Sequence, residues 1–388
     1  ALLQDEFGSL FTASIALESL DIRPFDHLPI ATSMAFVNGG FLFFTGFSSD
    51  HRIYQVLSFN ESSEDRLHLV DSITNNSPLL KGFISNVGNE EIPQFYFSSG
   101  CGESSSIATI RVGINVTEYA ITELPKQPRR IDSFSNYLAL CFEDSTTFLN
   151  VADSIEEVSD VPFRTNVETL LISELEDDVV LQIYPTGFTQ YTKERRLDWI
   201  APSGLIVTAC CCNPRQAVIC LEDNTSLYFE LIGGVLREAG RFRQSAKIIC
   251  VALSPVPAQR QRARFLAIGG EDLVIRVLSC DPGDRFEQLA LQAAASQPCS
   301  LVFSEKTLQV DIIYLHVGLS NGVYVRLDVK KSSGAIGNPF SRYIGSEPVR
   351  LYGSGNNSIR IAALSSKIWI YDEDKEISDF SFLPLSYQ

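Results

Sequence analysis

The fold of this chain is most evident in RFLAIGGEDLVIRVLS, residues 264–279. This stretch joins two short runs of β-branched, aliphatic and aromatic residues through a turn that contains Gly269, Gly270 and Asp272, which is the pattern of a β-hairpin. A hairpin of the same kind, DIIYLHVGLSNGVYVRLDV, follows at residues 311–329. No long stretch of the chain holds a 3.6-residue period, so we predict an all-β protein.

These hairpins belong to a repeat of roughly 35–50 residues, the length typical of propeller blades. From about residue 79 onward we count seven units, each with an inner strand, a hairpin and an outer strand. This predicts a seven-bladed β-propeller that is WD40-like but lacks WD motifs. The units begin with LLKGFISNV (79–87), RRIDSF (129–134), ETLLISEL (168–175), LIVTACCC (205–212), KIICVALS (247–254), SLVFSE (300–305) and VRLYGSG (349–355).

The residues before the repeat predict a domain boundary. A propeller closes when its first and last units share a blade, because an open β edge invites aggregation. We expect RLHLVDSI (66–73) to complete the last blade, so that residues 62–388 form the propeller. Residues 1–61 would then be a linker and the end of a preceding propeller. The chain begins without Met or a signal peptide, and we expect it to be a piece of a longer protein.

Composition and charge limit the function classes. With 45% hydrophobic and 20% charged residues, and no apolar run long enough to span a bilayer, the chain is predicted to be globular and not membrane-bound. A formal net charge of −16 disfavours strong direct binding to nucleic acid, so protein partners are expected. Nine cysteines without a CxxC pair favour a reducing compartment.

Cys210, Cys211 and Cys212 stand in a row, with Cys220 eight residues further on. They are candidates for a metal site, a redox centre or simple packing. Consecutive strand residues point to opposite faces, so Cys210 and Cys212 should face one side and Cys211 the other. A zinc site needs three or four converging ligands, and no His lies near this stretch. We therefore predict no metal and no cofactor, and interpret the thiols as small buried apolar groups.

Two kinds of pattern in the sequence resemble parts of enzyme active sites. GLSNG (318–322) matches the G-x-S-x-G pattern, but a strand follows Ser320 and all four His precede it, so a hairpin turn is the better interpretation. The carboxylate pairs Asp177/Asp178 and Glu156/Glu157 are adjacent in loops, where such pairs are usually solvated. We predict no catalytic residue and no enzymatic activity.

Three arginines alternate in QRQRARF, the chain's one basic cluster: Arg260, Arg262 and Arg264. Their alternation places the guanidiniums on one side, where they could bind a carboxylate-rich protein or a phosphate. We predict them as partner-binding residues. The alternative is that they form the solvated flank of a loop.

Longer stretches carry a resemblance to a known family. The sequence QRQRARFLAIGGEDLVIRVLSCDPGDRFEQLALQAAASQPCSLV (259–302) resembles the splicing factor 3b subunit 3 family of three-propeller proteins. EIPQFYFSSGCGESSSIATIRVGINVTEYAITELP (91–125) is similar to the first blade of that family's middle propeller. Further similarity lies at LQIYPTG, LHVGLSNGVYVRLDV, RYIGSEPVRLY and the terminal LPLSYQ, and so covers nearly the whole chain.

The resemblance implies a function. Members of this family serve as non-enzymatic scaffolds in the splicing factor 3b complex of the U2 small nuclear ribonucleoprotein, beside a HEAT-repeat subunit and a small subunit. It implies a nuclear location and a role in pre-mRNA splicing, in branch-site recognition and spliceosome assembly. The alternatives within the superfamily are a cullin ubiquitin-ligase adaptor and a polyadenylation-factor propeller. A propeller hydrolase is a remote alternative of a different class.

Overall fold

The structure is a computed structural model that describes residues 1–388 apart from 17–18, 38, 48, 59–65, 76–78, 86–93, 100–105, 111–113, 116–123, 125, 153, 194, 203, 306–310, 354–359, 367, 373–381 and 387–388. Every helix or strand that it describes is a β-strand, which confirms the all-β prediction. The described residues accordingly contain no helix that is long and apolar enough to cross a membrane.

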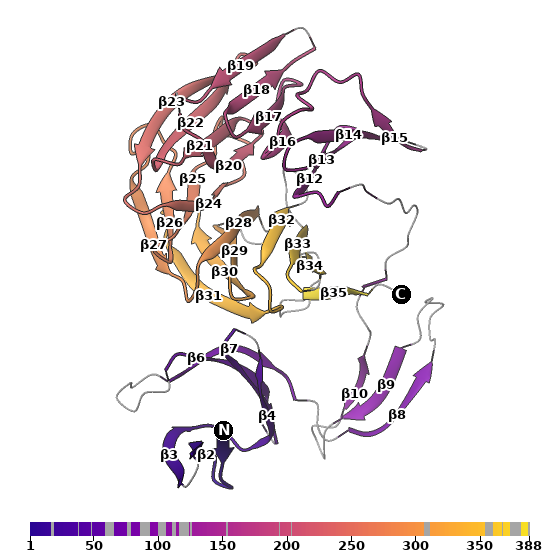
Figure 1. Ribbon diagram of the computed structural model, residues 1–388, viewed down its shortest axis with the longest axis vertical. Coiled ribbons are helices and arrows are strands. Elements are labelled where there is room, and N and C mark those ends of the chain that lie inside the picture. The colour runs from indigo at the N-terminus through magenta and orange to yellow at the C-terminus, as the bar shows by residue number, and fades with distance from the viewer. Residues whose placement is uncertain are drawn as a thin grey trace.

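Six sheets stand side by side around a common centre like the blades of a propeller (Figure 1). Each contains four consecutive strands, paired antiparallel in chain order, with the first strand innermost. They correspond to the second to seventh units of the predicted repeat. The sheets are β12–β15 (Arg130–Phe134, Tyr137–Cys141, Thr146–Val151, Ile155–Val158), β16–β19 (Leu171–Glu174, Val180–Tyr184, Gly187–Tyr191, Arg196–Ile200), β20–β23 (Val207–Asn213, Gln216–Leu221, Thr225–Ile232, Val235–Arg243), β24–β27 (Ile248–Leu253, Phe265–Gly270, Val274–Ser279, Gln288–Ala293), β28–β31 (Pro298–Glu305, Ile312–Leu319, Val323–Lys330, Ile336–Tyr343) and β32–β35 (Arg350–Gly353, Arg360–Leu364, Ile368–Asp372, Phe382–Ser386).

The blades pack face to face, and strand alternation divides their side chains between two neighbours. On β21, Ala217 and Ile219 are buried against the blade β16–β19, whereas Val218 and Cys220 are buried against the blade β24–β27. Every residue of β21 is buried, because both faces of its sheet are covered. Strands covered on both faces are rich in Val, Ile and Leu, and for this reason the inner hairpins were conspicuous in the sequence.

A further four-stranded sheet lies beside the blade β28–β31 (Figure 1). It contains β4 (Ala31–Val37), β5 (Phe41–Gly46), β6 (His51–Val56) and β7 (Leu67–Ile73). The prediction that residues 66–73 complete the last blade is wrong, because β7 pairs antiparallel with β6. Pairing through a loop of about ten residues costs less chain entropy than pairing with a strand some 300 residues away.

The start of the repeat differs from the other units. The strands β8 (Leu79–Ser85), β9 (Gln94–Ser99) and β10 (Ser106–Ile110) form a three-stranded sheet. The expected strand TEYAITEL (117–124) lies almost wholly outside the described residues. β11 (Ile114–Asn115) pairs parallel with β35 and adds a fifth strand to the last blade. The first and last units thus share a sheet through β11.

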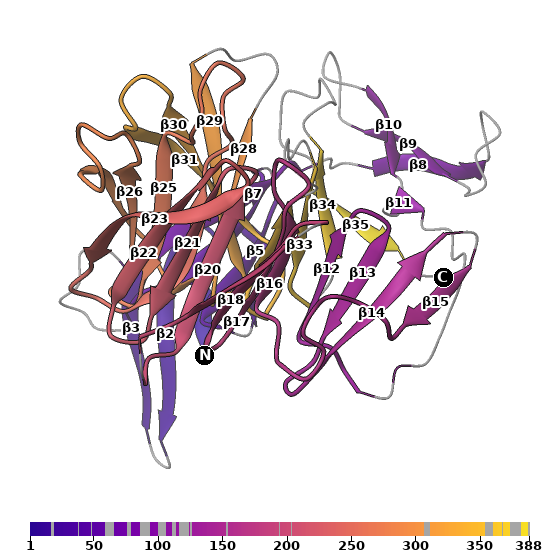
Figure 2. The ribbon, with the colours of Figure 1, turned by 90° about the horizontal axis from the view of Figure 1, so that it is seen from above.

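Before these sheets, β1 (Leu2–Gln4), β2 (Ser9–Ala16) and β3 (Ser19–His27) form one more antiparallel sheet. Its hairpin β2–β3 projects away from the body of the molecule (Figure 2). The side chain of Gln4 joins this sheet to the next, since its Oε1 accepts a hydrogen bond from Ala31 N (2.8 Å) and its Nε2 donates one to Pro29 O (2.8 Å).

Candidate functional site

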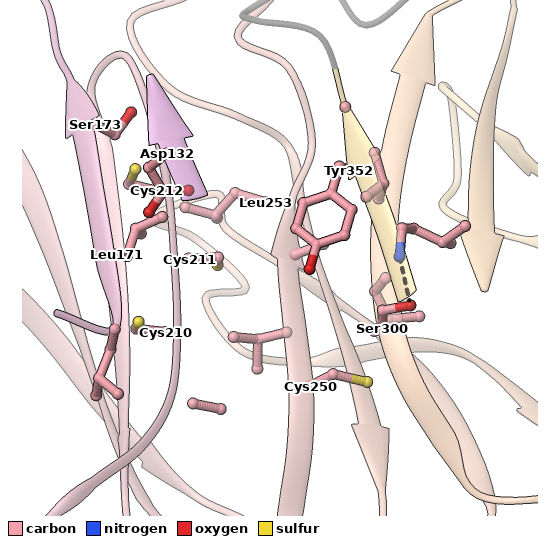
Figure 3. A pocket seen from close by; sticks show the side chains of 18 of the residues that line it. Asp132, Leu171, Ser173, Cys210, Cys211, Cys212, Cys250, Leu253, Ser300 and Tyr352 are labelled. Carbon is pink, nitrogen blue, oxygen red and sulfur yellow. Dashed lines mark hydrogen bonds between the residues drawn. The ribbon is translucent and has the colours of Figure 1, made fainter. Parts of the chain in front are cut away.

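The innermost strands of the six blades enclose a central cavity of about 690 Å³ (Figure 3). Because each blade contributes its first strand, the wall is made of residues that are distant in the sequence. The lining residues are 130–133, 170–173, 208–214, 249–253, 255, 299–303 and 351–353. This cavity is the centre of the propeller, where cysteine and hydroxyl side chains mix with aliphatic ones.

The triple cysteine lies on β20, in the wall of this cavity (Figure 3). Cys210 and Cys212 pack against the blade β16–β19, and Cys211 packs against the blade β24–β27, which confirms the predicted alternation. Cys220 belongs to the same cluster as Cys211, so the four thiols do not converge on one point. Within the described ranges, no three His, Cys, Asp or Glu residues gather as a metal site requires.

The chemistry of these thiols follows from their surroundings. Burial raises the pKa of Cys210 and of Cys220 to about 12, and that of Cys212 to about 11. Burial also raises the pKa of Cys211 well above its ordinary value. The thiolate is the nucleophile and metal ligand, so these groups are protonated and unreactive at neutral pH.

An ion pair at the cavity wall was missed by the sequence analysis. Arg130 Nε lies 2.7 Å from Asp132 Oδ2, and the same oxygen accepts a hydrogen bond from Ile172 N at 3.1 Å. Because the two residues are two apart on β12, they share one face of the strand. The R-x-D alternation within RRIDSF was the available signal. The carboxylate joins β12 to the neighbouring inner strand β16.

The three predicted partner-binding arginines lie in the loop between β24 and β25, and each is engaged within the chain. Arg262 forms a bidentate pair with Glu230, with both N–O distances at 3.1 Å. Arg260 pairs with Asp281, and Arg264 donates a hydrogen bond to Ser332 O at 2.7 Å. Arg264 Nε also lies 3.9 Å from Asp281 Oδ2, so Arg260 and Arg264 share one carboxylate while Arg262 pairs with another. Their role in partner binding stays a prediction.

The enzyme motifs appear as ordinary parts of the fold. Ser320 begins the β29–β30 turn, and its Oγ is 2.6 Å from Ser296 Oγ. Gly322 in this turn has φ +81°, and a Cβ there would lie 1.7 Å from Gly345 O, so the turn requires glycine. His316 is fully buried on β29, with Nε2 2.8 Å from Ser304 Oγ and Nδ1 bonded to Tyr324 OH. Its two ring nitrogens bond to Ser304 and Tyr324, and Ser320 Oγ bonds to Ser296.

The candidate carboxylates interact with residues close to them. Asp177 and Asp178 occupy the β16–β17 turn with φ of 60° and 55°, and Asp178 pairs with Lys193 at 2.8 Å. That hydrogen bond lowers the pKa of Asp178 below its ordinary value. Glu156 accepts a hydrogen bond from Ser154 Oγ at 2.9 Å. These carboxylates lie in surface turns and an outer strand, away from the central cavity.

Radial four-stranded sheets around a central cavity define this chain as a β-propeller protein. A family model described as the RSE1/DDB1/CPSF1 second beta-propeller matches residues 106–388. The chain belongs to this family.

Curated relatives match the chain over its whole length. It is 30% identical over 440 residues to the pre-mRNA-splicing factor rse1 of Emericella nidulans and to splicing factor 3B subunit 3 of Danio rerio. It is 29% identical over 439 residues to spliceosome-associated protein 130 A of Arabidopsis thaliana. In each case the match covers 100% of this chain and 36% of the relative, so the chain spans about a third of their length.

Proposed function

We propose that this chain is the middle propeller of a non-enzymatic scaffold protein of the splicing factor 3b complex, acting in pre-mRNA splicing within the U2 small nuclear ribonucleoprotein. The observation that carries the proposal is the match of the whole chain to relatives named as splicing factors. A scaffold needs a rigid body with a large surface, and a body of packed blades supplies one. The proposed location is the nucleus.

The surface charge supports binding to protein rather than RNA. The chain carries a formal net charge of −16, and each arginine of its one basic cluster is already engaged within the fold. RNA-binding surfaces combine basic grooves with exposed stacking platforms. We therefore propose partners among the other splicing factor 3b subunits, including the HEAT-repeat subunit and the small subunit, and no strong direct RNA contact by this chain.

Seven blades remain our proposal for the complete propeller. Five four-stranded sheets and the five-stranded last blade surround the cavity, and the sheet β8–β10 lies just before them in the chain. β11 follows β10 and pairs with the last blade, which supports a first blade placed between β12–β15 and β32–β35. We also propose that residues 1–61 belong to a preceding propeller, with β7 now assigned to the sheet of β4–β6.

The experiment that tests the function is affinity purification of the tagged full chain from nuclear extract, followed by mass spectrometry. Recovery of splicing factor 3b subunits is the expected result. Recovery of a cullin, or of polyadenylation factors, would assign the chain to another branch of its family, whose description includes DDB1 and CPSF1. Salt-sensitive RNA binding at nanomolar concentration would contradict the predicted lack of direct RNA contact.

We propose that Arg260, Arg262 and Arg264 contact a partner by exchanging their internal carboxylates for those of the partner. An acidic segment of a partner would have to replace Asp281 or Glu230 as the carboxylate on these guanidiniums. We expect the double replacement of Arg260 and Arg264 by Ala to lower subunit recovery at least threefold with the melting temperature within about 2 °C. Unchanged recovery would leave these arginines as a loop flank.

A further inference from the structure

We propose that the outer edge of β27, residues Gln288–Ala293, binds an extended segment of a partner protein as an added β-strand. β27 is the outermost strand of the blade β24–β27 and lies on the rim of the propeller (Figure 1). An outermost strand exposes alternate backbone N–H and C=O groups, which pair readily with another strand. The inference does not depend on the proposed function in splicing.

The outer strands of the other five blades are protected. β15, β19 and β23 carry charged side chains, which discourage pairing with another strand: Glu156, Glu157, Arg196, Asp198, Arg237, Glu238, Arg241 and Arg243. β31 contains Pro339 and Arg342 and lies against β7, and β35 is covered by β11. β27, with the sequence QLALQA, has no charge, no proline and no covering strand among the described pairings.

Apolar side chains are exposed along and beside this edge. Leu291 is 53% exposed in the middle of the strand. Leu273, 41% exposed, lies in the turn before β26 with φ 61°. Asn224 and Gly322 also have positive φ in the corresponding turns of the two neighbouring blades, so this conformation belongs to the blade turn, and the exposed Leu273 side chain adds apolar surface next to the edge.

The register shows which backbone groups are free to pair. Ala294 N donates a hydrogen bond to Leu273 O at 2.8 Å, so these two residues form a hydrogen-bonded pair. Hydrogen-bonded and non-hydrogen-bonded pairs alternate along an antiparallel ladder, and Val274↔Ala293 and Arg276↔Leu291 are therefore non-hydrogen-bonded pairs. In such a ladder, residues of the non-hydrogen-bonded pairs direct their N–H and C=O outward. Leu291 and Ala293 therefore present backbone donors and acceptors to the rim.

Charge at the two ends of the edge selects the occupant. Glu271 and Asp272 lie at the end near Ala294, and Glu287 lies at the other end, immediately before Gln288. Arg276 on β26 already neutralises Asp272, so the acidic charge at the two ends rests on Glu271 and Glu287. Two copies of this chain would place like charges together in an antiparallel edge pair. The edge fits a partner segment with alternating aliphatic residues and lysine or arginine at both ends.

The test uses the full chain and a synthetic probe, the peptide KKVTVTVTKK labelled with a fluorophore. We expect saturable binding, and hydrogen-exchange protection of residues 288–294 when the peptide is bound. Leu291→Lys and Ala293→Pro should each weaken binding at least tenfold. Ile200→Lys is the matched control, because Ile200 is 72% exposed on the outer strand β19, and it should leave binding unchanged.

Two comparisons make the outcome decisive. A peptide with N-methyl groups on alternate residues cannot pair through its backbone, so equal binding by this peptide would overturn strand addition. Stronger binding by DDVTVTVTDD would overturn the charge assignment. No saturable binding, or protection outside residues 288–294, would overturn the site. A concentration-dependent dimer of the free chain that Leu291→Lys abolishes would assign the edge to a second copy instead.

Discussion

His316 shows how one buried polar side chain is held neutral by its surroundings. Burial, with a further contribution from Arg326, lowers the pKa of His316 to about 3. The unfolded chain binds a proton at this histidine near pH 6.5, and the folded chain does not. The free energy of unfolding should therefore fall as pH drops from about 6.5 toward 3, by up to about 1.4 kcal/mol per pH unit. Urea titrations of the chain and of His316→Gln between pH 5 and 8 measure this slope.

We expect the stability difference between the chain and His316→Gln to grow from pH 5 to about 6.5 and then to level off. Parallel curves would show that the folded and unfolded chains bind protons equally at His316, which would contradict the lowered pKa. If the variant does not fold, NMR titration of the His316 ring in the unaltered chain gives the same answer. Its ring signals should not move between pH 8 and 5, while those of an exposed histidine do.

The cysteines of β20 provide a test of the packing interpretation at the same scale. Since the thiols are protonated and split between two faces, removal of metal should not alter the fold. We expect the melting temperature to stay within about 1 °C when EDTA is added to the purified chain. A fall of several degrees, restored by Zn²⁺ and absent from Cys210→Ala, would contradict the packing interpretation.

Gln216 illustrates how neighbouring elements are joined. It is fully buried, its Oε1 accepts hydrogen bonds from Ala263 N (2.6 Å) and Asn213 Nδ2 (2.9 Å), and its Nε2 donates to Tyr228 OH. One side chain thus connects its own blade to the β24–β25 loop. Gln216→Leu leaves several buried groups unpaired, and we expect a loss of about 2–4 kcal/mol in the free energy of unfolding.

Urea unfolding followed by circular dichroism measures this loss. Gln288→Leu is the matched control, because that glutamine is exposed on β27 and should change stability by about 0.5 kcal/mol or less. Equal effects of the two substitutions would show that the Gln216 contacts add nothing to stability.

The same elements show what the sequence could predict. Hairpins such as β25–β26 were evident because short apolar runs flank a Gly- and Asp-containing turn, and alternation correctly divided the cysteines of β20. Partners across long sequence distances were not evident. Glu230 on β22 and Arg262 in the β24–β25 loop meet only because the two blades are adjacent. RLHLVDSI was recognisable as a strand, but nothing in its residues indicates which edge it pairs with.

At the scale of the whole molecule, residues 31–73 share a core with the blade β28–β31. Phe41, Ile53 and Val70 belong to the same buried cluster as Leu315 and the neighbouring side chains of that blade. The Phe41 ring centroid lies 4.8 Å from that of Tyr343, and Arg342 Nε is 3.3 Å from Asp71 Oδ2. A propeller cut at residue 62 would lose β4–β6 and leave β7 without its partner.

We therefore expect a chain of residues 62–388 to melt at least 5 °C below a chain of residues 31–388, or to aggregate, because its β6-facing edge and apolar face are exposed. Phe41→Ala tests the same contact without a deletion. Phe41 is fully buried, so its truncation should cost about 3–5 kcal/mol, while Phe36→Ala, at a site 54% exposed on β4, should cost far less. Differential scanning calorimetry of the two chains and two variants measures these effects. Equal melting temperatures for both chains, together with equal costs for both phenylalanines, would show that the sheet β4–β7 is an independent body.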